Sequence, residues 1–139
     1  MRMTKGVGIC RIQAAGKHRV KNHYWGDEET VVSTPYYMVR VLTICAGEST
    51  DVHYHQVRYE SIMALEGELR LLRARCSDIL LPGATVNIPN MTPHRLVNEG
   101  DKPIRVLEVC TAIRNDDHKM RPRDMDRFLT SAYGVKNAT

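Results

Sequence analysis

The chain has 139 residues, of which 42% are hydrophobic and 26% are charged, and its formal net charge is +4 at pH 7. This length predicts one domain that buries roughly two-thirds of its unfolded surface, so that a core forms without disulfides or structural metals. No apolar run approaches the roughly 20 residues of a membrane span, and the basic N-terminus lacks the apolar stretch of a secretory signal. We therefore expect a cytoplasmic protein with no membrane partner.

Basic residues are concentrated at the start of the chain. Residues 1–26 contain six Lys or Arg and no acid, whereas residues 27–139 contain 14 basic and 16 acidic residues. The six basic residues are scattered, with no interleaved aromatic residues, and a nucleic-acid-binding protein would gather them on one face or element. The pattern indicates a solvated arm and no nucleic-acid partner.

The chain has four cysteines, and none of them belongs to a C-x-x-C pair. Three of the four sit inside apolar, strand-like runs. This spacing favours buried free thiols over a disulfide framework or a zinc knuckle. The four are Cys10, Cys45, Cys76 and Cys110.

From Tyr36 onward the sequence consists of eight short β-rich runs separated by turn residues. The runs are YYMVRVLTICAG, DVHYH, RYESIMALEG, ELRLLRARC, DILLPG, ATVNIPN, HRLVNEG and IRVLEVCTAI. Such close and even spacing predicts an all-β sandwich or barrel, which we place at residues 36–113. Within it, LEGEL predicts a hairpin around Gly67, and residues 98–103 predict a loop.

The two ends of the chain are predicted to lie outside this barrel. Residues 1–35 are expected to form an N-terminal arm that could add one or two strands. Residues 114–139 form a charged extension, either as an exposed helix broken near Pro122 or as a strap over the barrel.

Two histidines, one residue apart, precede a glutamate in the second and third of these runs. Side chains alternate between faces along a strand, so His53 and His55 point the same way about 7 Å apart and both rings can converge on one ion. A turn at residues 56–57 would start the next strand. On that strand Arg58 and Glu60 share a face, and Glu60 could meet the two histidines across the sheet.

A fourth ligand can be found downstream at His94, at the head of the run HRLVNEG. Three imidazoles and one carboxylate leave a six-coordinate metal two open positions, as a catalytic site requires. Taken alone, an H-x-H pair in a strand is more often a surface or packed pair than a pair of metal ligands.

The first of these stretches resembles the first signature of the cupin family, G-x5-H-x-H-x(3,4)-E-x6-G. The matching residues are Gly47, His53, His55, Glu60 and Gly67. GATVNIPNMTPHRLVN is similar to the second signature, G-x5-P-x-G-x2-H-x3-N. It matches at Gly83, Pro89, His94 and Asn98, with Met91 where glycine is expected.

The cupin resemblance implies a fold and a metal. The fold is a jelly-roll barrel, a double-stranded β-helix, here with the charged C-terminal extension. Its mouth would hold one divalent transition metal (Zn, Mn, Fe, Ni or Co) on His53, His55, Glu60 and His94. Such barrels commonly bury their sheet edges by pairing two subunits, so a homodimer is expected by analogy.

Roughly residues 23–128 also resemble the isomerase domain of type II mannose-6-phosphate isomerases. The residues that carry this resemblance are Trp25-Gly26, YYMVRVL with Arg40, R-x-E at Arg58 and Glu60, residues 88–109, Asp116-Asp117 and RDMDRF. Family members usually have a tryptophan soon after the metal glutamate, where this chain has Ser61-Ile62. The resemblance implies a metal-dependent enzyme that converts an aldose phosphate to a ketose phosphate.

Isomerisation of this kind requires a polarised carbonyl, a base near the carbon and cations for the phosphate. Arg58 is the first candidate for contact with a small anionic substrate, with a salt bridge to Asp51 as the alternative. Arg40 either faces the pocket or lies outside it, and the second is slightly favoured, with Tyr37, Val39, Val41 and Thr43 lining the core. Tyr59 and Trp25 are further candidates, although core packing is the default explanation of Trp25. The pattern does not identify the base.

Three functions are compatible with this sequence. The first is a metal-dependent aldose–ketose isomerase. The second is a non-haem iron dioxygenase, because histidine-rich sites with open positions also activate O₂. The third is a binding module that senses a small molecule and catalyses nothing.

Overall fold

The computed structural model describes residues 18–112 and 118–119, which form eleven β-strands and no helix. The strands are β1 (Arg19–His23), β2 (Gly26–Ser33), β3 (Tyr37–Ile44), β4 (Tyr54–His55), β5 (Glu60–Glu66), β6 (Leu69–Arg73), β7 (Cys76–Leu80), β8 (Thr85–Ile88), β9 (His94–Val97), β10 (Ile104–Thr111) and β11 (His118–Lys119). Each of the eight predicted runs contributes one strand, from β3 to β10. The predicted all-β class is confirmed. The described residues therefore also contain no helix with the length and apolar character needed to cross a membrane.

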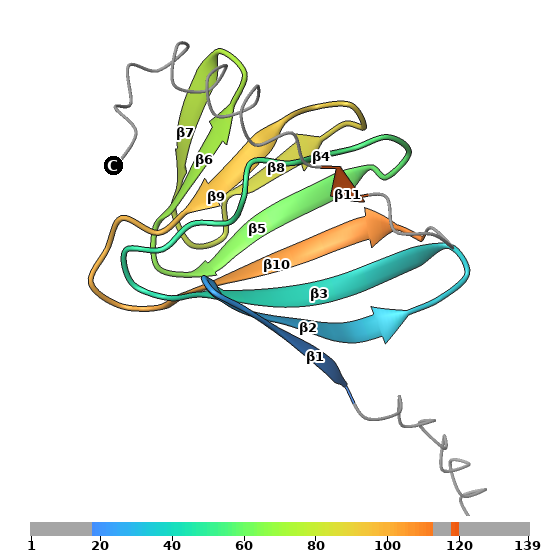
Figure 1. Ribbon diagram of the computed structural model, residues 1–139, viewed down its shortest axis with the longest axis horizontal. Helices are drawn as coiled ribbons and strands as arrows, with labels where there is room; N and C mark the ends of the chain where they lie inside the picture. Colours follow the sequence, from blue (N-terminus) through green and yellow to red (C-terminus); the bar gives the residue numbers. More distant parts are fainter. Residues whose placement is uncertain (1–17, 113–117, 120–139) are drawn as a thin grey trace, which may run out of the picture.

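The strands form two principal sheets. The larger sheet has the order β1-β2-β3-β10-β5-β8 and the smaller β7-β6-β9, while β4 pairs with β11 (Figure 1). The strand pairings among the described residues are all antiparallel, as expected for a jelly roll. The larger sheet includes two strands, β1 and β2, that precede residue 36.

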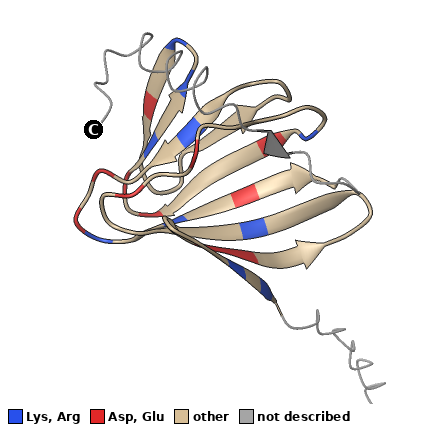
Figure 2. Ribbon diagram, viewed as in Figure 1, with Lys and Arg blue, Asp and Glu red and all other residues tan. Residues whose placement is uncertain are grey.

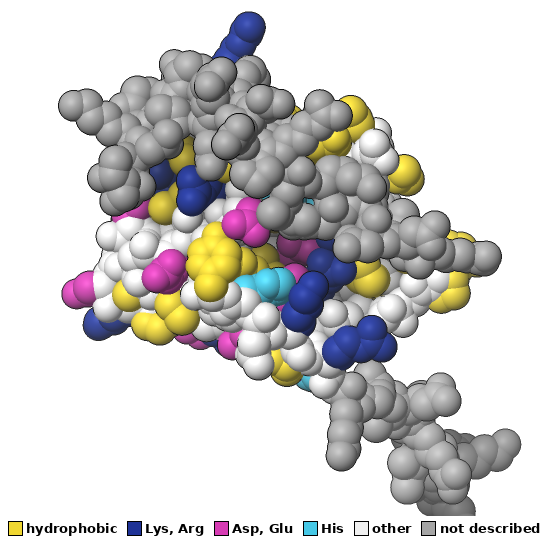
Figure 3. All heavy atoms as spheres, viewed as in Figure 1, with side chains coloured by type: hydrophobic (Ala, Val, Ile, Leu, Met, Phe, Trp, Pro, Cys, Tyr) yellow, Lys and Arg dark blue, Asp and Glu magenta, His cyan; other side chains and the backbone are white. Residues whose placement is uncertain are grey.

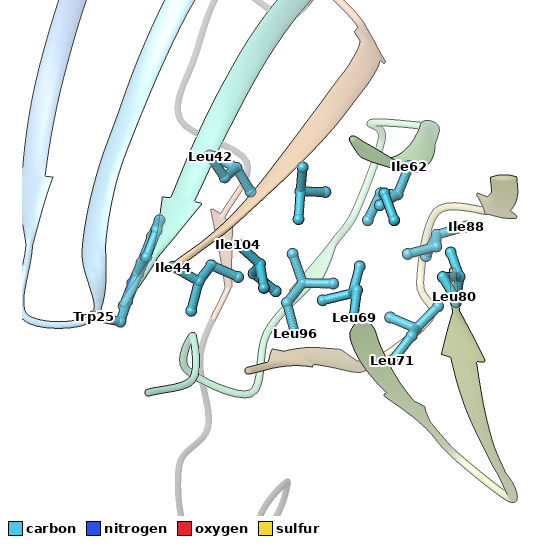
Figure 4. Close-up of a cluster of buried hydrophobic side chains, with 12 residues drawn as sticks. Trp25, Leu42, Ile44, Ile62, Leu69, Leu71, Leu80, Ile88, Leu96 and Ile104 are labelled. Atoms are coloured by element: carbon cyan, nitrogen blue, oxygen red, sulfur yellow. The ribbon is translucent and has the colours of Figure 1, made fainter. Parts of the chain in front are cut away.

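A hydrophobic cluster fills the space between the two sheets (Figure 4). Larger-sheet residues such as Ile44 and Val106 meet smaller-sheet residues such as Leu69 and Leu71, and all four are fully buried. Each buried side chain of this size stabilises the fold by about 1.5–3 kcal/mol relative to exposure. Trp25 closes the cluster next to β1 and β2, where its ring stacks on His23 at 4.5 Å.

The inward face of the larger sheet is apolar at one end and polar at the other. On β3, Leu42 and Ile44 are buried at 3% and 0% exposure, and Arg40 belongs to the same alternating set. The expectation that Tyr37, Val39, Val41 and Thr43 line the core, with Arg40 outside it, is therefore wrong. The register explains the difference, because Arg40 lies opposite Glu108 of β10 and its inward guanidinium finds a carboxylate there.

The predicted hairpin around Gly67 is also wrong. β5 pairs with β10 and β8, whereas β6 pairs with β7 and β9, so the chain crosses from one sheet to the other at this glycine. Gly67 has a φ of +78°, and a Cβ atom there would lie 2.4 Å from Cγ2 of Ile104. The glycine permits a close approach between the crossing and β10.

The cysteines are only partly as predicted. Cys45, Cys76 and Cys110 are free thiols, but only Cys110 is buried. Cys45 follows the last residue of β3 and Cys76 starts β7, an edge strand, so both are exposed. Cys10 lies outside the described residues.

The charged tail, apart from β11, and residues 1–17 of the N-terminal arm also lie outside the described residues. The choice between an exposed helix and a strap for residues 114–139 therefore stays open. The homodimer expected at the sheet edges stays a prediction.

Asn98, the last residue of the second signature, ties together three segments of backbone. Its Nδ2 donates to the carbonyl oxygens of Ile44, Cys45 and Lys102 at 3.0, 3.1 and 2.8 Å. Its Oδ1 accepts from the Gly100 amide at 3.0 Å, and the side chain is 1% exposed. The loop after β9 is thereby fixed to the end of β3.

Replacing this buried amide should destabilise the fold. Asn98→Ala leaves carbonyl groups buried without their donor, so we expect the free energy of unfolding to fall by about 3 kcal/mol in urea denaturation. Asn87→Ala is the matched control, because Asn87 is exposed and bonds only to Ser61 among the described residues. An equal loss in both variants would contradict the role assigned to Asn98.

Candidate metal centre

Three buried histidines converge at one end of the space between the sheets. His55 ends β4, His94 begins β9, and an isolated bridge joins the backbone of His53 to that of His94. One ring nitrogen from each of the three lies within 4.8 Å of the others. The sequence predicted this convergence, and the structure confirms that His53 and His55 face the same way.

Backbone carbonyls fix the orientation of two of these rings. Nδ1 of His53 donates to the Asp51 carbonyl at 2.8 Å, and Nδ1 of His94 donates to the Thr92 carbonyl at 2.9 Å. A carbonyl oxygen only accepts, so Nδ1 carries a hydrogen, and in the neutral ring Nε2 then keeps its lone pair. Metal-bound histidines are typically held in this way, and both Nε2 atoms are thereby prepared as ligands.

Glu60 lies directly beside this histidine triad. Its Oε1 is 3.0 Å from Nε2 of His55 and its Oε2 is 3.2 Å from Nε2 of His94. Burial raises the pKa of this carboxyl, but the contacts from His55 and His94 outweigh burial and hold its pKa below the usual range. Glu60 is therefore an anion beside three imidazole rings.

The donor set fits a divalent transition metal. Ligand bonds of about 2.0–2.2 Å place neighbouring ligands of an octahedral ion about 3 Å apart, close to the carboxylate–imidazole separations seen here. Oε2 of Glu60 is buried and makes no hydrogen bond of good geometry within the described part of the chain. The buried triad could therefore bind a metal ion, and Glu60 as its fourth ligand stays a prediction.

A second group of buried charges adjoins the triad. Nη1 of Arg58 lies 3.3 Å from Glu60 and 3.8 Å from Glu108, and Nη1 of Arg40 lies 3.4 Å from Glu108 and 3.3 Å from Glu28. The acidic residue of β10 and the basic residue of β3 appear side by side in Figure 2. The structure thus places both predicted arginines on the inward side, Arg58 beside Glu60 and Arg40 beside Glu108.

Glu108 is the site residue that the sequence prediction missed. It is 6% exposed, and burial together with the charge of Glu60 raises its pKa to about 8, although Arg40 and Arg58 act in the opposite direction. Alternation along β10 could have identified it, because Ile104, Val106, Glu108 and Cys110 share the inward face. Burial also raises the pKa of the Cys110 thiol to about 12, so this cysteine is a poor nucleophile.

The remaining predicted contacts lie farther out or elsewhere. Tyr59 is 46% exposed and its backbone pairs with Thr111. Asp51, the alternative partner of Arg58, accepts a 2.8 Å hydrogen bond from the Tyr24 hydroxyl. Trp25 is part of the buried hydrophobic cluster and not of the site. Histidine, acidic and basic side chains meet near the middle of the face shown in Figure 3.

Met91 shows why the second signature prefers glycine at this position. Its φ is +60°, in the left-handed region, and its side chain is 58% exposed. Its amide donates to the carbonyl of His55 at 2.6 Å, which ties this turn to a ligand strand. The turn is therefore kept at a conformational cost of about 1 kcal/mol, and no ligand is displaced.

Removal of one triad imidazole should abolish tight metal binding. We expect His94→Ala to lower metal affinity at least about 100-fold, measured by competition with a chromogenic chelator, because the loss of a direct ligand exceeds typical outer-shell effects. His18→Ala is the control, since His18 is exposed and contacts Glu29. Full metal occupancy in a folded His94→Ala protein would refute the assignment.

Restoring glycine to the second signature should stabilise the fold. Met91→Gly relieves the left-handed conformation, and we expect the free energy of unfolding to rise by about 1 kcal/mol. Met91→Ala is the matched comparison, because it shortens the side chain but keeps the unfavourable φ. A gain shared by both variants would show that the exposed side chain, and not the backbone, is responsible.

Comparison with known proteins agrees with this geometry. Residues 40–110 match the family model of the cupin domain. The mannose-1-phosphate guanylyltransferase RfbM of Salmonella typhimurium is 28% identical over 85 residues, which cover 61% of this chain and 18% of RfbM. The chain thus spans about a fifth of the length of the curated relatives it matches. The predicted relationship to the isomerase region of such bifunctional enzymes is confirmed as distant homology.

Solved structures show the same fold. The cupin-2 domain Rru_A2000 of Rhodospirillum rubrum superposes with a TM-score of 0.71 at 16% identity, covering 83% of this chain and 81% of that one. A sugar phosphate isomerase of the cupin superfamily from Silicibacter pomeroyi gives a TM-score of 0.59 at 23% identity, covering 70% and 71%. Fold, signatures and triad agree, and the chain belongs to the cupin family.

Proposed function

We propose that this protein is a metal-dependent aldose–ketose isomerase that acts on a sugar phosphate. The observation that carries the proposal is the buried histidine triad beside Glu60, with two rings fixed by backbone carbonyls. Distant homology to bacterial mannose-1-phosphate guanylyltransferases supports the substrate class, as does the fold shared with a protein described as a sugar phosphate isomerase.

His53, His55 and His94, with Glu60 as the fourth ligand, would hold the metal. A divalent transition metal bound there supplies Lewis acidity, which polarises a carbonyl oxygen and makes the neighbouring C–H bond more acidic. The protein contributes oriented donors and burial, and burial excludes competing water. These are the requirements for moving a proton between adjacent carbons.

Arg58, Arg40 and Tyr59 are the proposed substrate contacts. Both guanidiniums lie close to carboxylates, and each has five N–H donors, so a guanidinium could contact a substrate oxygen as well as its carboxylate. Tyr59 is exposed and alternates with the buried Arg58 and Glu60, so its hydroxyl would contact only a part of the substrate that extends to the outer surface. Trp25 is not needed in this scheme, because the core accounts for its position.

A direct test uses protein purified without chelators and loaded separately with Zn, Mn, Fe, Ni or Co. We expect one of these preparations to convert an aldose 6-phosphate, mannose 6-phosphate first, into the corresponding ketose phosphate, detected by ¹³C NMR under anaerobic conditions. His94→Ala, loaded in the same way, should show no conversion. Conversion by the variant at the wild-type rate would point to a contaminating enzyme.

Other outcomes would replace the proposal. Uptake of O₂ that depends on Fe(II) and a candidate substrate, without anaerobic turnover, would identify a dioxygenase. Thermal stabilisation by a sugar phosphate that is recovered unchanged would identify a binding module.

A further inference from the structure

The buried charge cluster beside the triad contains one carboxylate more than its arginines require. Arg58 lies 3.3 Å from Glu60, and Arg40 lies 3.3 Å from Glu28. These two pairs are complete without Glu108, which lies 3.4 Å from Arg40 and 3.8 Å from Arg58. Glu108 is therefore a surplus acid on the inward face.

Burying such a surplus group has a cost. A carboxylate taken out of water lowers stability unless ion pairs and hydrogen bonds compensate, and an apolar residue would pack at less cost. The preceding inward residues of the same strand, Ile104 and Val106, are apolar and fully part of the core. If position 108 served only to pack the core, we would expect another apolar residue there. The acid at this position therefore calls for a functional explanation.

Contacts place Glu108 next to the metal ligands but not among them. The same nitrogen of Arg58 touches Glu108 and Glu60, and Glu60 in turn touches His55 and His94. Glu60 contacts two of the three rings, whereas the ion pairs of Glu108 among the described residues are with Arg40 and Arg58. A substrate that reaches the ligands through the polar end would therefore meet a carboxylate with no ligand role.

We propose that Glu108 is the catalytic base that carries the proton between the two carbons during isomerisation, with Arg40 and Arg58 as positioning residues. This inference rests on the proposed function. It assigns the one role, proton transfer, that the metal and its ligands leave open.

The step balances without a further reactant. The C2–H bond of the aldose breaks, the proton goes to an Oε of Glu108, and the electron pair forms the C=C bond of an enediolate as the carbonyl π pair moves to O1. The C2 hydroxyl proton passes to O1, and Glu108 returns its proton to C1. The product is the ketose, and the carboxylate is restored.

The surroundings of Glu108 suit a group that must both accept and return a proton. Arg40 and Arg58 face it as cations, Glu60 and Glu28 as anions, and the Cys110 thiol stays protonated. Burial, followed by the charge of Glu60, raises its pKa to about 8 against the two arginines, within about one unit of the neutral pH at which a general acid–base group works best. This supports the geometric argument.

The test compares Glu108→Gln with Glu66→Gln. Glu66 is a matched control on β5, where its exposed side chain pairs only with Arg105 among the described residues. In metal-loaded Glu108→Gln, kcat should fall at least about 100-fold, the usual contribution of a general base. KM and metal content should stay within about threefold of wild type, since neither substrate binding nor the ligands are altered. Glu108→Asp, which keeps the carboxylate one methylene farther back, should recover part of the loss.

A second measurement does not depend on the folding of a variant. Wild-type protein converting the aldose phosphate in D₂O should place deuterium at C1 of the ketose, because a carboxyl group exchanges its proton with solvent. Product without any deuterium would indicate a hydride shift and would overturn the role of Glu108.

The outcomes separate this inference from the function on which it rests. If wild type isomerises a sugar phosphate and Glu108→Gln retains kcat within about threefold, the base is another group and only the present inference fails. If wild type converts none of the substrates with any of the metals, the proposed function fails and the role of Glu108 fails with it.

Discussion

The pairing of buried charges is the constraint on which the rest of this structure depends. Glu60, Arg58, Glu108 and Arg40 are largely shielded from water, and each lies within 3.8 Å of an opposite charge or an imidazole. Isolated charges in such an interior would cost several kcal/mol each. The cluster is tolerated because strand register brings the partners together. Glu108 lies opposite Arg40, and Cys110 lies opposite Glu60, so the charges occupy adjacent rows of one sheet face.

This arrangement divides the interior into two parts with different tasks. Val106 lies two residues before Glu108 on β10, opposite Leu42 of β3 and Ala64 of β5. All three are buried apolar residues. The apolar rows, packed against the smaller sheet, supply stability from hydrophobic burial. The polar rows lower that stability. They lie beside the histidine triad, so stability is given up at the candidate functional site, as is common for such sites.

The strands and the convergence of the histidine triad followed well from the sequence, because both depend on short-range patterns. His53 and His55 share a face by strand alternation alone, and eight apolar runs gave eight strands. Features that depend on contacts between distant segments were harder to predict. Gly67 marks a sheet crossing instead of a hairpin because β5 pairs with β8 and β10, whereas β6 pairs with β7 and β9. Arg40 points inward because its partner is Glu108, 68 residues away.

The distribution of charge also bears on what kind of cupin this is. A module that only senses a ligand needs shape and a few oriented polar groups, and a carboxylate beyond those needed to pair two arginines adds nothing to recognition of an anion. Repulsion between such a carboxylate and a phosphate would weaken binding. An enzyme that moves a proton has a use for that group, because a base must sit near the reacting carbon and away from the metal's own ligands. The surplus acid at Glu108 therefore favours catalysis over recognition. This inference uses the charges of this chain and not the functions of related proteins.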